Sequence, residues 1–286
     1  MEMVGETMAN QWDVRRLAGA LGAEVRGLRL ADADDGDIAE IKRLLVEHMV
    51  LFFPEQNMSM DEHVALGRPF GPLEGHPNLK DRNSQEHPEV FALTASQGGI
   101  ADEWHTDLTF QAEPALMSIL NMVKCPDTGG DTCFMSMYAA LDALPTDIRE
   151  AIRGKSLNHD SSHDSAGNLR SNHTAFEDVS GAPGAQHPIV RAHPETGRPA
   201  LFLGRRLHAW IVGESVESSE ALLDRIWEHC TRQEFTYCHQ WQRGDLLMWD
   251  NRCTMHRRDP FDAQARRVMH RTQLKGDAPV RAAASA

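Results

Sequence analysis

Four stretches of the chain place apolar side chains at helical spacing, with polar positions between them. They are residues 34–49, 59–67, 137–153 and 218–230. The first has an acidic start, which the positive end of a helix dipole favours. The second begins at Ser59, and Glu62 follows three residues later, which is the sequence pattern of a capping box. The four stretches are therefore predicted to be helices.

Shorter runs of apolar or alternating residues predict strands. They are residues 23–30, 50–53, 90–95, 115–123, 132–136, 189–192, 200–203, 246–249 and 266–274. Gly-Pro, His-Pro and Gly-Gly pairs mark several of the loops between elements. Many short strands with a few helices predict a mainly β domain, a sandwich or barrel with flanking helices. The length of 286 residues fits a single domain that spans residues 1–286.

Residues 158–187 interrupt this pattern. The stretch is polar and rich in Ser, His, Gly and Asn, and it separates two regions of strand-like runs. Connections of this length inside a compact domain are rarely passive. We therefore expect residues 158–187 to form a lid or a substrate-binding loop.

Charge narrows the classes of function. The chain has 29 basic and 42 acidic residues, which gives a formal charge of −13. Such a surface repels nucleic-acid phosphates and anionic lipid, so neither nucleic acid nor a membrane is an expected partner. Residues 1–10 show no basic-then-apolar leader, and no apolar run approaches the roughly 20 residues that a membrane span needs. A small anionic substrate would have to be captured by local arginines.

Cysteine usage bears on the redox compartment. The five cysteines are Cys125, Cys133, Cys230, Cys238 and Cys253. Their number is odd, and no two of them form a Cys-x-x-Cys pair. The pattern therefore predicts neither a disulfide framework nor a Cys-rich zinc site, and it favours a cytoplasmic location.

One short segment carries candidate metal ligands. Side chains at positions i and i+2 of a strand point to the same face, so His105 and Asp107 can aim an imidazole and a carboxylate at one point. A His-x-Asp pair is a weak signal by itself in a chain with 15 histidines. A second imidazole, such as that of His256 after the predicted strand 246–249, would complete a two-histidine, one-carboxylate face. That face leaves part of the coordination sphere of Fe(II) open.

Two arginines share one face of the predicted strand 266–274. Arg267, Met269 and Arg271 alternate along it and point the same way. Buried guanidinium groups are costly without anionic partners, and their planar forks bind carboxylates through two hydrogen bonds. The strand therefore predicts that one or more organic anions bind inside the domain.

Six motifs of this chain occur in the same order in a known family. They are Trp104–Phe110, Gly129–Thr132, Met137–Pro145, His193–Arg198, Gly244–Arg257 and Arg266–Asp277. With these motifs the chain resembles the taurine dioxygenase / 2,4-dichlorophenoxyacetate dioxygenase family of Fe(II)- and 2-oxoglutarate-dependent enzymes. The resemblance is weak between residue 23 and Trp104 and strong from Trp104 onward, and it covers most of the chain.

The resemblance implies a double-stranded β-helix, or jelly roll, and a dioxygenase that uses Fe(II), 2-oxoglutarate and O₂. It implies that His105, Asp107 and His256 are the iron ligands and catalytic residues. It further implies that Arg267 and Thr132 hold the distal carboxylate of 2-oxoglutarate.

For the substrate, the resemblance implies that Arg271 faces an anionic group and that His76 and Leu108 line the pocket. Leu207 stands where the taurine enzymes have an aromatic pocket residue, and Ala101 stands where they have a polar one. Both differences argue against taurine itself as the substrate. The amino-acid sequence of the motif around His256 is more similar to the aryloxyalkanoate branch of the family.

These observations favour hydroxylation of an aryloxyalkanoate-type carboxylate, with cleavage of the ether. A sulfonate or an alkyl sulfate is the alternative substrate. Two remote alternatives are a zinc hydrolase, which can use the same ligand types but does not need Arg267 and Thr132, and a non-catalytic jelly-roll binding protein. The resemblance also implies a homo-oligomer, a dimer or a tetramer.

Overall fold

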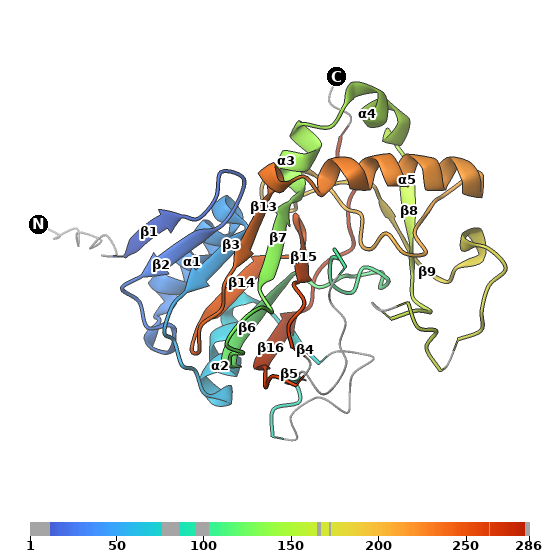
Figure 1. The fold of residues 1–286 in the computed structure, drawn as a ribbon. Helices are drawn as coiled ribbons and strands as arrows, with labels where there is room; N and C mark the ends of the chain where they lie inside the picture. The colour runs from blue at the N-terminus through green and yellow to red at the C-terminus, as the bar shows by residue number, and fades with distance from the viewer. Residues whose placement is uncertain are drawn as a thin grey trace, which may run out of the picture.

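The structure is a computed structural model that describes residues 12–75, 86–94, 103–164, 167–171, 173–262 and 264–283. It is mainly β with helices on the outside, as the sequence predicted (Figure 1). The largest sheet has eight strands, seven of them in the order β1-β2-β3-β14-β6-β16-β4, with β5 also paired to β16. Their bounds are Asp13–Arg16 (β1), Ala23–Arg26 (β2), Val50–Phe53 (β3), Leu246–Asp250 (β14), Met117–Lys124 (β6), Val268–Leu274 (β16), Leu73–Glu74 (β4) and Phe91–Thr94 (β5).

Three smaller sheets complete the β structure. They are β13-β7-β15 (Thr236–His239, Thr132–Ser136 and Thr254–Arg258), β12-β8-β9 (Trp210–Ile211, Ser156–Asp160 and Gly184–Pro188) and β10-β11 (Val190–Ala192 and Pro199–Leu201). Strands far apart in the sequence pair with each other. Examples are β14 with β3 in the eight-stranded sheet and β15 with β7 in the β13-β7-β15 sheet. This long-range pairing brings the C-terminal motifs beside the middle of the chain.

In the described ranges, five α-helices lie around the sheets. They are α1 (Asp35–His48), α2 (Met60–Gly67), α3 (Met137–Asp142), α4 (Thr146–Ile152) and α5 (Val216–Cys230), and single-turn 3-10 helices span Leu30–Asp32, Arg68–Phe70, Val179–Gly181 and Gln233–Phe235. The predicted capping box of α2 is present: Ser59 Oγ accepts from Glu62 N at 3.2 Å, and Glu62 Oε2 accepts from Ser59 N at 2.8 Å. The single helix predicted over 137–153 is wrong, because Pro145 cannot continue a helix and separates α3 from α4.

The central strands of the large sheet are buried on both faces, whereas β1 at its edge is exposed. Along β14, Leu246 and Met248 belong to one apolar cluster, whereas Leu247 and Trp249 belong to a second cluster on the other side. This alternation is what the period of two along a strand requires. Helix α1 contributes to the first cluster. The second cluster includes the side of β14 that faces His256, whose ring lies 4.8 Å from that of Trp249.

The stretch 158–187 contains more regular structure than its composition predicted. Its two ends belong to β8 and β9, which pair antiparallel. These strands have no apolar pattern because several of their buried side chains are polar, among them Asn158, His159 and His187. The described part of the connection between the two strands has little regular structure beyond the 3-10 turn Val179–Gly181, so a lid or loop role stays a prediction for that part.

One cysteine pair corrects the sequence analysis. Cys133 on β7 and Cys238 on β13 lie directly opposite each other and are joined by a disulfide. The expectation that the cysteines form no disulfide is therefore wrong for this pair. Sequence spacing could not show it, since 105 residues separate the two cysteines. The cysteine argument for a cytoplasmic location loses its force, and that location stays a prediction.

A buried ionic network holds the end of β14. Asp250 is fully buried, its Oδ2 lies 3.0 Å from His193 Nε2, and it accepts from Arg252 Nη2 at 2.7 Å and Nε at 2.9 Å. Burial alone would raise the pKa of Asp250, but Arg252 and His193 outweigh it and hold that pKa well below its usual value of 3.8. The network ties the 193–198 motif to the turn that leads into β15, the strand of His256.

We expect Asp250→Ala to lower the free energy of unfolding by about 3–5 kcal/mol. It removes the buried partner of both Arg252 and His193, and the other carboxylate beside Arg252, that of Glu195, is exposed to solvent. Urea unfolding at pH 7 measures this. The carboxylate has a lower pKa in the folded state than in the unfolded state, so its contribution is complete at neutral pH and is lost as the pH falls below the usual range of an aspartate. The exposed pair Asp142–Arg198 is the control, and Asp142→Ala should cost less than about 1 kcal/mol. Equal costs for the two variants would contradict this account.

Candidate metal centre

Three side chains predicted to bind metal converge on one point. The ligand atoms of His105, Asp107 and His256 lie within 4.8 Å of one another. Asp107 Oδ1 is 3.9 Å from His105 Nε2 and 3.8 Å from His256 Nε2. Asp107 and His256 are buried, and the rings of the two histidines lie 4.2 Å apart. The convergence expected from the sequence is therefore present.

The strand that was predicted to position His105 and Asp107 is wrong. His105 and Asp107 do not lie on a regular strand; His105 forms only isolated bridges, and Asp107 begins a turn. His105 and His256 are held opposite each other by reciprocal backbone hydrogen bonds, N to O at 2.9 Å and 2.8 Å. A bridge to β15 replaces the predicted strand, and it aligns the two imidazoles directly.

The turn after Asp107 is conformationally strained. Leu108 has φ +53°, the left-handed region that costs a residue with a side chain roughly 1–2 kcal/mol. The turn is closed by a hydrogen bond from Gln111 N to Leu108 O at 2.9 Å, and the Leu108 side chain is buried. Such a conformation persists only where the surroundings impose it, so the position of the Asp107 carboxylate is closely fixed.

The protonation states suit metal binding. His105 Nδ1 lies 2.8 Å from Glu103 O, which places the ring proton on Nδ1 and leaves the Nε2 lone pair facing the cluster. Burial lowers the pKa of both His105 and His256, so both rings are neutral. Burial would raise the pKa of Asp107, but the charge of Arg271 and the nearby histidines hold it well below its usual range. Two neutral imidazoles and one carboxylate are a donor set that fits Fe(II).

Arg271 lies directly against this cluster. Its Nη2 donates to Asp107 Oδ2 and, at 2.8 Å, to Ser118 Oγ. The guanidinium also lies 5.1 Å from the Trp249 ring centre and 5.6 Å from that of Phe91. A fixed cation with aromatic walls, beside a metal cluster, is a suitable partner for an organic anion.

Arg267 is a second buried arginine, and it has no carboxylate partner among the residues that the structure describes. It donates to Gly130 O at 3.1 Å, while its buried Nε makes no hydrogen bond to any described residue. Burial lowers its pKa to about 10, so it is still a cation at neutral pH. A buried guanidinium with unused donors indicates a site for an anion.

Residues 130–132 complete this anion site. Gly130 has φ +75°, and a side chain there would meet Arg267 Nε at 3.1 Å, so glycine allows the arginine to approach. Thr132 Oγ1 accepts a hydrogen bond from Trp241 Nε1 at 2.9 Å. The Thr132 hydroxyl proton is thereby left free to be donated to an anion.

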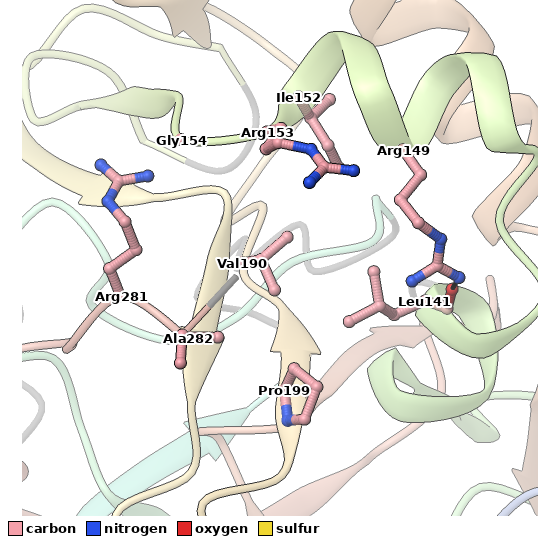
Figure 2. Close-up of a pocket in the computed structure, with 10 residues that line it drawn as sticks. Leu141, Arg149, Ile152, Arg153, Gly154, Val190, Pro199, Arg281 and Ala282 are labelled. Carbon is pink, nitrogen blue, oxygen red and sulfur yellow. Dashed lines mark hydrogen bonds between the residues drawn. The ribbon is translucent and has the colours of Figure 1, made fainter. Parts of the chain in front are cut away.

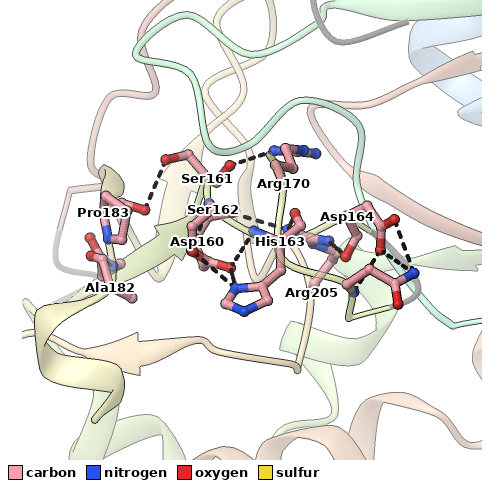
Figure 3. Close-up of polar contacts among 11 residues, drawn as sticks. Asp160, Ser161, Ser162, His163, Asp164, Arg170, Ala182, Pro183 and Arg205 are labelled. Carbon is pink, nitrogen blue, oxygen red and sulfur yellow. Dashed lines mark hydrogen bonds and ion pairs between the residues drawn. The ribbon is translucent and has the colours of Figure 1, made fainter. Parts of the chain in front are cut away.

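Arg205 lies among residues of the 158–187 stretch (Figure 3) and links that stretch to the metal cluster. Its guanidinium donates to the backbone oxygens of Asp160, His163 and Asp164 at 3.0, 3.2 and 2.5 Å. Its own backbone forms an isolated bridge with His105. This arginine was not predicted from the sequence, because nothing in its spacing distinguishes it from its neighbour Arg206.

The remaining predicted substrate residues are spread more widely. Leu207 is 47% exposed, and its side chain lies against Gly167, in the connection between β8 and β9. His76 and Ala101 lie outside the described residues. Arg271 and Leu108 lie at the cluster, and their substrate roles, like those of His76 and Leu207, stay predictions.

Comparison with known proteins agrees with this geometry. Residues 13–273 match the profile of the "Taurine catabolism dioxygenase TauD, TfdA family". The chain is 36% identical over 278 residues to the alpha-ketoglutarate-dependent 2,4-dichlorophenoxyacetate dioxygenase of Cupriavidus pinatubonensis, an alignment covering 91% of this chain and 96% of that enzyme. It is 33% identical over 283 residues to the alpha-ketoglutarate-dependent sulfate ester dioxygenase of Pseudomonas putida, covering 95% of this chain and 92% of that enzyme.

A solved structure is similar over nearly the same span. The crystal structure of AAD-2 in complex with Mn(II) and N-oxalylglycine superimposes with a TM-score of 0.80 at 30% sequence identity. The match covers 94% of this chain and 99% of that chain. That structure holds a divalent metal, and the present chain has the donor set for one.

Proposed function

This chain belongs to the taurine catabolism dioxygenase TauD, TfdA family, and we propose that it hydroxylates an aryloxyalkanoate-type carboxylate at the carbon next to the ether oxygen. As a member of this family it is an oxidoreductase that uses Fe(II), 2-oxoglutarate and O₂. We assign the iron to His105, Asp107 and His256. We assign the distal carboxylate of 2-oxoglutarate to Arg267 and Thr132, and the substrate carboxylate to Arg271.

The observation that carries this proposal is the pair of buried guanidinium groups at separate positions. Arg267 has no carboxylate partner among the described residues, and Arg271 lies against the carboxylate of the metal cluster. Each group can hold one carboxylate, and the proposed reaction brings two organic anions together. A zinc hydrolase would have no use for the first of these sites.

When bound, the ferrous ion with 2-oxoglutarate and O₂ supplies the oxidising chemistry. The chain supplies position and charge. His105 and His256 stay neutral because they are buried, and Arg271 fixes Asp107 as a carboxylate. We expect the substrate carboxylate to share Arg271 with Asp107, which sets the distance between the reacting carbon and the metal cluster.

The reaction balances without a further reagent. One O₂, one 2-oxoglutarate and one substrate give succinate, CO₂ and a product hydroxylated at the carbon that bears the aryloxy group. That product is a hemiacetal or hemiketal, so the bond between the hydroxylated carbon and the aryloxy oxygen breaks, the hydroxyl becomes a carbonyl, and the aryloxy group leaves with a proton as a phenol. The remaining fragment is an aldehyde or keto acid.

The double-stranded β-helix topology is also part of this proposal, supported by the mainly β fold and by the similar solved structure. In the part of the chain that the structure describes, no helix has the length and apolar character to cross a bilayer. A homo-oligomeric state and a cytoplasmic location stay predictions.

A sulfate ester or sulfonate substrate is the second candidate. The 33% identity to a sulfate ester dioxygenase favours it, and Arg271 could hold a sulfate as well as a carboxylate. A panel assay of substrate-dependent succinate formation decides between them, with phenoxyacetate, 2-phenoxypropanoate, hexyl sulfate and taurine. Turnover of the aryloxy acids with release of phenol is expected. Turnover of hexyl sulfate alone would establish the second candidate.

Arg271→Ala should raise the KM for the aryloxy acid by about 10- to 100-fold, the effect of losing one charge-assisted interaction. The KM for 2-oxoglutarate should change much less, because Arg267 is intact. Steady-state kinetics with each compound varied in turn measures both constants. Equal increases in the two KM values would mean that the roles of the two arginines are exchanged or shared.

A further inference from the structure

A cavity lies apart from the metal cluster, between α3, α4, the β10-β11 hairpin and the C-terminal segment (Figure 2). Its volume is about 210 Å³, and its lining includes no residue of the metal cluster and neither Arg267 nor Arg271. Much of its lining is apolar, including Leu141, Ile152, Val190 and Pro199. The cavity therefore offers a surface for a small apolar group.

Three arginines stand around this apolar lining. Arg149 and Arg153 come from α4 and its end, and Arg281 stands on the opposite side of the cavity (Figure 2). Within the described residues, none of the three forms an ion pair with a carboxylate. On a chain with a formal charge of −13, three such neighbouring cations form a local site of opposite sign.

The three guanidinium groups form different numbers of hydrogen bonds within the chain. Arg149 donates to the backbone oxygens of Leu141 and Asp142, at the end of α3. Arg281 donates to Lys155 O at 2.8 Å and to a neighbouring serine hydroxyl. The guanidinium of Arg153 has no hydrogen-bond partner among the described residues, and the residue is exposed. Because a guanidinium has five donor hydrogens, all three retain donors for a ligand.

The wall that carries Arg281 is held in place by hydrogen bonds. Ala192 N donates to Val280 O at 2.8 Å, and Ala282 N donates to Val190 O at 3.1 Å. The C-terminal segment thus runs beside β10 as a paired edge. The position of Arg281 at the rim is therefore fixed by the fold.

We propose that this cavity is a second binding site, for a small organic anion that combines a carboxylate with an aryl or short alkyl group. The apolar group would occupy the lining, and the carboxylate would be held by Arg153 with Arg149 and Arg281. A different explanation exists for part of the arrangement, since cations near the end of α4 complement its dipole. That explanation accounts for neither Arg281 nor the apolar lining between the arginines.

The test is isothermal titration of 3-phenylpropanoate into the full chain, with the wild type compared with Arg153→Ala. The Arg153 side chain makes no hydrogen bond or ion pair with a described residue, and its capping bond to Glu150 O uses the backbone N–H, so we expect the alanine variant to keep the fold. Arg243→Ala is the matched control. Arg243 is exposed and lies in a different turn, and its substitution removes the same charge. We expect at least a fivefold loss of affinity in Arg153→Ala for one binding event, and no change in Arg243→Ala.

Two further probes separate the parts of the site. The neutral analogue 3-phenylpropan-1-ol tests the need for charge, and inorganic phosphate tests the need for the apolar group. Both should bind at least about tenfold more weakly than 3-phenylpropanoate at the Arg153-dependent site. Ala282→Leu, which narrows the cavity without changing its charge, should weaken that binding as well. Unchanged affinity in Arg153→Ala, or equal binding of phosphate, would overturn the proposal.

Discussion

Asp107→Ala is expected to lower substrate-dependent succinate formation by at least about 10³-fold, equivalent to roughly 4 kcal/mol of transition-state stabilisation. The reason is that the Asp107 carboxylate stands between two imidazoles and supplies the only negative charge of that cluster. Without it, the two histidines would hold Fe(II) weakly. Succinate formation and the iron content of the purified protein, measured on the same sample, test both parts.

This variant also removes the partner of buried Arg271, so the fold has to be checked separately. Asp107→Asn keeps the size of the side chain and an oxygen that can accept from Arg271, and it should still lose most of its iron. Glu47→Ala is the control, since Glu47 is an exposed carboxylate on α1 paired with Arg43. Near wild-type turnover in a well-folded Asp107→Ala would exclude this carboxylate as a ligand.

Arg267→Met is expected to raise the KM for 2-oxoglutarate by about 10²-fold, because two charge-assisted hydrogen bonds to the distal carboxylate are lost. Turnover at saturating 2-oxoglutarate should fall much less. The free chain should be as stable as the wild type or more stable, because a buried cation without a carboxylate partner among the described residues is replaced by an apolar side chain.

Thermal unfolding separates this prediction from a general loss of structure. In the wild type that already holds Mn(II), addition of N-oxalylglycine should raise the unfolding temperature further, since a ligand that binds only the folded state stabilises it. That increase should disappear in Arg267→Met and persist in Arg271→Ala. A variant that keeps the increase in unfolding temperature and the wild-type KM would show that 2-oxoglutarate is held elsewhere.

Much of the site could be predicted because its residues belong to recognisable sequence motifs. His105, Asp107 and His256 converge as expected, although the strand invoked for His105 does not exist. The convergence depends on reciprocal backbone bonds between His105 and β15, which are long-range contacts. Local periodicity reports only on neighbours in the chain, so it gave the correct partners with the wrong backbone geometry.

The elements that could not be predicted are those whose buried faces are polar or whose signal is tertiary. Strand β8 buries Asn158, His159 and Asp160, so it lacks the apolar alternation by which strands are recognised. The role of Arg205 depends on three backbone oxygens of a distant segment. The break between α3 and α4 is different, because Pro145 was visible in the sequence and should have ended the predicted helix.

The disulfide between Cys133 and Cys238 affects how the protein is handled. An enzyme that needs ferrous iron is usually kept with a reductant, and dithiothreitol opens accessible disulfides whereas ascorbate leaves them closed. Cys133 directly follows Thr132, and Cys238 is exposed to solvent. Batches stored with a thiol and batches stored with ascorbate would therefore differ by one covalent cross-link beside the proposed 2-oxoglutarate site, and their kinetics should be compared before they are pooled.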